Sequence, residues 1–77
     1  MIEVEIHKES VALFKILKFE GLVASGGEAK QVIAEGLVSV NGQVQTQKRK
    51  KIIAGDTIEY AGHCLRVTAT DELARSE

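Results

Sequence analysis

The chain has 77 residues, of which 44% are hydrophobic and 27% charged, so its size and composition fit one small globular domain and exclude a disordered protein. A single cysteine excludes an intramolecular disulfide and a four-cysteine zinc site, and we expect a soluble, cytoplasmic protein because no signal-peptide or membrane-spanning stretch is evident. The net charge of −1 is unevenly divided: residues 15–51 carry seven Lys and Arg against three acidic residues, and the remainder carries three against eight. Such a division can present a basic face to a polyanion.

Residues 2–6 alternate apolar and polar side chains, and this period of two predicts a half-buried strand. Ser10 is the predicted N-cap of a first helix that extends to Glu20, and Gly21 suits the left-handed conformation that ends many helices. The apolar residues of this segment fall at helical spacing and predict its buried side: Leu13, Phe14, Ile16 and Leu17.

A second helix is predicted to begin after Ser25. The Ser25 hydroxyl can accept a hydrogen bond from the amide of Glu28, whose carboxylate can reach back to the amide of the cap residue, which makes a capping box. Gly36 is expected to end this helix, and Lys30 is expected on its exposed side. Residues at spacings of three and four predict its buried stripe: Ala29, Val32 and Ile33.

Beyond the second helix the sequence alternates short strands with turns. Asn41-Gly42 tolerates the positive φ angles of a tight turn, so residues 38–46 are predicted to form a hairpin. Two more strands, each preceded by a turn, complete the pattern: residues 57–60 after Gly55-Asp56, and residues 63–69 after Ala61-Gly62.

These elements together predict an α+β fold, in which two helices pack on a small set of short, mostly antiparallel strands. Residues 1–70 are expected to form this single domain, and residues 71–77 a flexible acidic tail.

The densest charge on the chain is the run Lys48-Arg49-Lys50-Lys51. Four adjacent cations repel one another, so stability alone gives little reason to collect them. In an extended segment Lys48 and Lys50 would point to one side and Arg49 and Lys51 to the other. On the run alone, binding to nucleic acid and a solvated connection that aids solubility are equally good interpretations.

Ser25-Gly26-Gly27 offers exposed backbone amides at the positive end of a helix dipole, where phosphate can bind. Gly26 and Gly27 carry no side chain, so another backbone can approach closely. Two glycines before a helix are, however, more often only a turn.

The sequence gives no case for an enzyme. His63 and Cys64 are adjacent on a predicted strand, so their side chains point to opposite faces and cannot readily act on one atom. We expect Cys64 to be a small core residue and His63 a surface residue. Asp56 follows a glycine and is interpreted as a turn residue. No cofactor, metal or small-molecule substrate is expected.

Several segments resemble one known family, the RNA-binding domain named after ribosomal protein S-four. The resemblance covers roughly residues 13–60 and rests mainly on Ala29-Lys30 of the second helix and on the block from Glu35 to Gly42. The stand-alone form, with Ser25-Gly26-Gly27 and Ala61-Gly62-His63, is similar to the YbcJ-like group of small bacterial proteins. The chain departs from many members at Ala12-Leu13-Phe14, where they carry Arg-Leu-Asp, and at Gly26, where they carry Arg.

The resemblance implies the alpha-L RNA-binding motif, with structured RNA held across the second helix and the following hairpin. Carried over by position, the implied RNA-binding residues are Lys18, Ser25, Gly26, Gly27, Lys30, Gln31, Asn41 and Gly42, with Lys48, Arg49, Lys50 and Lys51 alongside.

The expected function is therefore that of a small RNA-binding protein whose target is a folded RNA, with ribosomal RNA as a candidate. Aromatic residues make up only 4% of the chain, so base-stacking platforms should be nearly absent and sequence-specific reading of single strands is not expected. The alternative is a protein-interaction module whose basic face binds an acidic partner. The oligomeric state is left open by the sequence.

Overall fold

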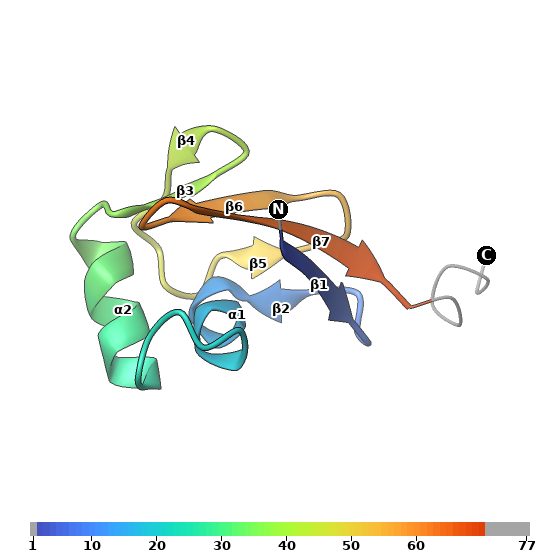
Figure 1. Ribbon diagram of the computed structural model, residues 1–77, viewed down its shortest axis with the longest axis horizontal. Coiled ribbons are helices and arrows are strands. Elements are labelled where there is room, and N and C mark those ends of the chain that lie inside the picture. The colour runs from blue at the N-terminus through green and yellow to red at the C-terminus, as the bar shows by residue number, and fades with distance from the viewer. Residues whose placement is uncertain (1, 71–77) are drawn as a thin grey trace.

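The computed structural model describes residues 2–70, so the predicted tail at residues 71–77 lies outside the described part. Figure 1 shows strands and helices along this length, with both helices in the first half of the chain. Their bounds are β1 (Ile2–Ile6), β2 (Val11–Ala12), α1 (Leu13–Phe19), α2 (Gly26–Ala34), β3 (Val38–Val40), β4 (Gln43–Val44), β5 (Lys51–Ile52), β6 (Thr57–Tyr60) and β7 (His63–Ala69).

Five strands form one sheet in the order β1-β7-β6-β3-β4, and β2 pairs separately with β5. Only β1 and β7 are parallel; every other pair is antiparallel. Both helices and the β2–β5 pair lie on the same side of the larger sheet (Figure 1). The α+β fold predicted from the sequence is confirmed.

The first helix begins two residues later than predicted, because Ala12 and not Ser10 is its N-cap. Val11 and Ala12 pair with Ile52 and Lys51, and this extended pairing keeps them out of the helix. The N-cap is Ala12, which has no side chain that could accept a hydrogen bond from the first helical amides. Those amides must therefore find acceptors elsewhere in the fold.

Both helices end as predicted, at Gly21 and Gly36, which adopt φ angles of 72° and 78°. Each glycine amide, and the amide of the residue after it, donates to a carbonyl in the last turn of the helix, which is the Schellman arrangement.

The second helix has the predicted cap at Ser25, whose hydroxyl accepts from the Glu28 amide at 3.2 Å. The return contact differs by one residue from the prediction. The Glu28 carboxylate accepts from the Ala24 amide at 2.9 Å, and not from the amide of Ser25. The capping box therefore extends one residue further into the loop before α2 than the sequence predicted.

The core lies between the sheet and the helices and consists entirely of aliphatic side chains. The predicted stripe of α2 is buried, and so is the inward face of each long strand. The predicted stripe of α1 is buried except at Phe14, which is half-buried at the edge of the core. The core residues are Val4, Ile6, Leu13, Ile16, Leu17, Val23, Ala29, Val32, Ile33, Val38, Val40, Ile52, Ile58, Leu65 and Val67.

The other face of the sheet carries no covering layer within residues 2–70, and it is polar. Cys64 lies on this face, since its neighbour Leu65 points into the core and successive side chains of a strand alternate. The expectation that Cys64 is a core residue is wrong: it is half-buried, opposite Glu59 of β6. His63 is exposed, as expected.

A matched pair of isoleucines tests the placement of this core. Ile33 is 0% exposed, whereas Ile53 is 51% exposed. We expect Ile33→Ala to lower the free energy of unfolding by about 2–5 kcal/mol, because it leaves a cavity in a small core. Ile53→Ala removes the same atoms from the surface and should change stability by less than about 0.5 kcal/mol. Urea denaturation followed by circular dichroism measures both, and equal losses would show that the helix face is misassigned.

Candidate nucleic-acid interface

The four cations predicted to contact nucleic acid lie in an exposed turn before and at the start of β5. We call residues 48–51 the basic loop; all four of its side chains are exposed. The Lys50 amide donates to the Gln47 carbonyl at 3.1 Å, so the loop turns instead of running straight. The strict alternation of an extended segment therefore does not apply to Lys48, Arg49 and Lys50, and only Lys51 lies in a strand.

The backbone of the basic loop supplies the acceptors that the start of α1 lacks. The Leu13 amide donates to the Lys50 carbonyl at 2.9 Å, and the Phe14 amide donates to the Lys48 carbonyl at 3.2 Å. These two bonds extend the β2–β5 pairing into the first turn of α1. Because only carbonyl groups are used, the loop is fixed in place while its charged side chains remain free.

Phe14 also connects α1 to the cation of α2. The Lys30 ammonium lies over the Phe14 ring, 4.9 Å from its centroid, which is a cation–π contact. Lys30 is consequently half-buried, and the expectation of a fully exposed side chain is wrong. Its ammonium is held in place by the ring, and Gln31 beside it is exposed.

Lys18 lies four residues after Phe14 on α1, so both side chains lie on one face of the helix. Lys18 is exposed. The backbone of the basic loop, the first turn of α1 and the Lys30 ammonium of α2 thus meet at Phe14. We call the cations of these three elements the basic surface; it comprises Lys18, Lys30, Lys48, Arg49, Lys50 and Lys51. The sequence indicated each of these six cations but not the bridging role of Phe14.

The start of α2 is open to close approach. A Cβ atom built on Gly26 would meet nothing within 4 Å, and one on Gly27 only the Ser25 hydroxyl at 3.8 Å. Neither glycine has a positive φ angle, so helical geometry alone does not require glycine here. The Glu28 carboxylate is held by the Ala24 amide on this side of the helix.

The predicted turn at Asn41-Gly42 is confirmed, with φ angles of 52° and 82° that match a tight hairpin. Its side-chain contacts, however, are with another turn and not with α2. The Asn41 side chain donates to Asp56 at 3.0 Å and accepts from the Thr57 amide at 2.9 Å. In Figure 1 the loop between β3 and β4 points away from α2. The structure therefore does not bring Asn41 and Gly42 together with Lys30 and Gln31.

Asp56 holds this second turn together, as its interpretation as a turn residue predicted. One carboxylate oxygen accepts from the Ile53 amide at 3.0 Å and the other from Asn41. Between residues 2 and 70, no three His, Cys, Asp or Glu side chains gather as a metal site requires. No helix in that stretch is long and apolar enough to cross a membrane.

The sequence is similar to those of several known proteins. The S4 domain family matches residues 4–68 of the chain. The Escherichia coli protein named "Putative RNA-binding protein YbcJ" is 52% identical over 59 residues, which span 77% of this chain and 84% of that protein. A Bacillus subtilis protein, "Probable ribosome maturation protein RlbA", is 32% identical over 59 residues, or 77% of this chain and 83% of its own length.

The solution structure of E. coli YbcJ has a closely similar fold. It superimposes with a TM-score of 0.70 at 47% identity, and the match covers 90% of this chain and 89% of that one. That structure is described as revealing an αL motif involved in RNA binding.

Substitutions at Asn41 test the bond between the two turns. We expect Asn41→Ala to lower the free energy of unfolding by about 1–3 kcal/mol, because it removes two hydrogen bonds and places alanine at a left-handed φ angle. Asn41→Gly removes the same bonds but suits that angle, so its loss should be about 1 kcal/mol smaller. Thermal and urea denaturation of both variants measure the difference. An Asn41→Ala variant as stable as the parent would contradict the linkage of the turns.

Proposed function

Because the chain belongs to the S4 domain family, we propose that it is a small RNA-binding protein that recognises structured RNA through its basic surface. The observation that carries this proposal is the convergence of the basic loop, α1 and α2 at Phe14. Lysine and arginine side chains neutralise phosphates and release counterions, which gives affinity without sequence information. Discrimination would come from the shape of the RNA and its 2′-hydroxyl groups.

The start of α2 adds a second kind of phosphate contact to the proposed interface. The amides of Gly26 and Gly27 lie at the positive end of the helix dipole, where an RNA backbone could come close because no side chain intervenes. Ser25 and Gln31 are exposed on the same helix segment and can donate to phosphate or sugar oxygens. Asn41 and Gly42 lie apart from α2, so they would contact RNA only where it extends beyond the basic surface to the hairpin.

Ribosomal RNA is the first candidate target. The support is indirect: the B. subtilis relative is named for ribosome maturation. We propose further that the protein acts in the cytoplasm and acts by binding, without catalysis, because the relatives are named as RNA-binding or maturation proteins and none as an enzyme.

Replacement of all four basic-loop cations by glutamine tests the phosphate contacts. We expect the variant to bind every RNA more weakly by a similar factor. The slope of log K against log salt should fall by roughly 1.4–3.6, at about 0.7–0.9 for each of about two to four lost phosphate contacts. The fold should survive, because the loop is anchored by backbone carbonyls. Fluorescence anisotropy with a labelled stem-loop RNA at several salt concentrations measures the slope.

Arg66 provides a control for that variant, because it is exposed and lies on the uncovered face of the sheet. Arg66→Gln should leave the slope unchanged. A folded four-glutamine variant with the parental slope would exclude the basic loop from the interface. Equal salt-dependent retention on an acidic protein of matched charge would favour the alternative, a protein-interaction module.

Gly26 tests whether RNA approaches the α2 backbone. The free protein has room for a side chain there, so neither Gly26→Ala nor Gly26→Arg should reduce stability. We expect both to weaken RNA binding, because each places a Cβ atom where the RNA backbone should lie. A new ion pair from arginine, up to about 1–3 kcal/mol, should not offset this exclusion. Tighter binding by Gly26→Arg, with no change for Gly26→Ala, would contradict close approach of RNA to the α2 backbone. It would show instead that a basic side chain at position 26 can bind phosphate and that this chain lacks one.

A further inference from the structure

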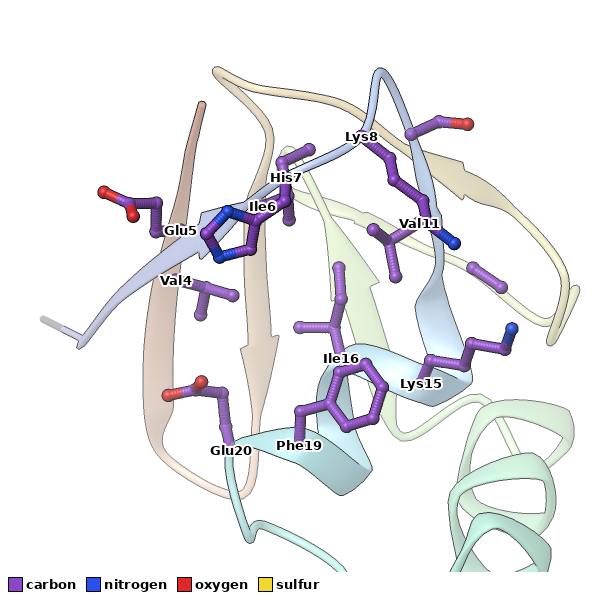
Figure 2. A pocket seen from close by; sticks show the side chains of 12 residues that line it. Val4, Glu5, Ile6, His7, Lys8, Val11, Lys15, Ile16, Phe19 and Glu20 are labelled. Atoms are coloured by element: carbon purple, nitrogen blue, oxygen red, sulfur yellow. The ribbon is translucent and has the colours of Figure 1, made fainter. Parts of the chain in front are cut away.

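A pocket of about 390 Å³ lies on the other side of α1 from the cation–π contact. It is formed between β1, the segment from His7 to Ala12, and α1. Figure 2 shows Val4, Val11 and Ile16 converging on its centre. The volume is within the range of small-ligand sites, which is roughly 300–1,000 Å³.

Phe19 lies at the edge of this pocket and is 69% exposed. An exposed phenylalanine is unexpected in a chain with so few aromatic residues, since the core could have buried it. In Figure 2 its ring borders the pocket, with the His7 imidazole on the far side of the apolar centre. The ring therefore offers the stacking platform that composition alone did not predict.

The charges around the pocket are separated. Lys8 and Lys15 lie together on one side of it and Glu20 lies on the other, whereas the Glu5 carboxylate points away from the pocket centre (Figure 2). A nucleotide has the complementary arrangement: a phosphate for the lysine side, and a base with at least one N–H donor, whichever of the four bases it is, for the carboxylate side. The Glu20 carboxylate also repels phosphate from its own side, which favours this orientation.

The lysine side of the pocket adjoins the basic loop. Ala12, which lines the pocket, is directly paired with Lys51 across the β2–β5 ladder, so the two side chains lie on one face of that ladder. Lys15 follows Phe14 on α1 and is exposed. A strand leaving the basic loop can thus pass from Lys51 to Lys15 without crossing an acidic region.

We propose that this pocket binds one unpaired nucleotide of the RNA held on the basic surface, with the base stacked on Phe19 and the phosphate between Lys8 and Lys15. The inference rests on the proposed RNA-binding function and adds a single-stranded contact to it.

The test compares two fluorescent RNAs at fixed salt: a blunt stem-loop, and the same stem-loop extended by a single-stranded tail of adenosines. The parental protein should bind the tailed RNA about 5- to 150-fold more tightly, the factor expected from stacking one base. Phe19→Leu should abolish this gain and leave the affinity for the blunt stem-loop unchanged. Phe19→Tyr keeps the ring and should retain the gain. All three side chains are tolerated at an exposed position, so folding is not at issue.

The lysines are tested by the combined change Lys8→Gln and Lys15→Gln. It should reduce the salt slope for the tailed RNA by up to about 1.4, at roughly 0.7 per contact with a single strand, and leave the slope for the blunt RNA unchanged. Equal parental affinity for the two RNAs, or a tail gain that survives Phe19→Leu, would overturn the pocket proposal while RNA binding stands. Failure to bind either RNA would instead refute the RNA-binding function and this inference with it. Adenosine monophosphate alone binding as tightly as the tail would make this a free-nucleotide site and also overturn the proposal.

Discussion

The backbone pairing between β2 and β5 determines where the charged part of the molecule lies. It brings the carbonyls of Lys48 and Lys50 to the amides of Phe14 and Leu13, which have no side-chain cap. Amides without an acceptor at a helix start carry a free-energy cost. The carbonyls of the basic loop remove this cost by accepting from the first amides of α1, and the same hydrogen bonds hold the loop in place. The loop gains a fixed course without using its side chains, and α1 gains acceptors without a capping residue.

This arrangement is electrostatically unfavourable in the free protein. The basic loop lies at the positive end of α1, and its four cations repel one another as well as the lysines of both helices. Carbonyl acceptors and the Phe14 ring offset part of this repulsion, but no acidic side chain is held against the loop by a described hydrogen bond. A bound polyanion would relieve the remaining repulsion. Binding of a polyanion therefore explains the clustering of these cations better than a contribution to folding stability does.

The two sides of the sheet differ in the balance of their charges. One side is covered by the helices and carries the basic surface at its rim. The other is uncovered in the part of the chain that the structure describes, and its exposed acidic residues, Glu3, Glu5 and Glu59, outnumber its one exposed arginine, Arg66. An RNA attracted to the helical side would be repelled from the opposite one. The thin aliphatic core suffices because it has only to hold one layer of helices on one sheet.

The features that the amino-acid sequence alone was enough to predict include those whose hydrogen bonds join residues close along the chain: the Ser25 cap of α2, the glycine stops of both helices and the Asn41-Gly42 turn. The alternation of the long strands was also predictable, because it follows from which side chains are apolar. The sequence also identified the basic loop as exposed. Tertiary structure alone decided the start of α1, the half-buried position of Lys30, the engagement of Asn41 with Asp56 and the exposure of Phe19. The first three depend on contacts between residues far apart in the sequence, and the last depends on which side of α1 the fold leaves uncovered. A local sequence pattern predicts neither the long-range contacts nor the uncovered side of α1. In each case the residues that make the contact or cover the surface come from distant parts of the chain and are brought together only by folding.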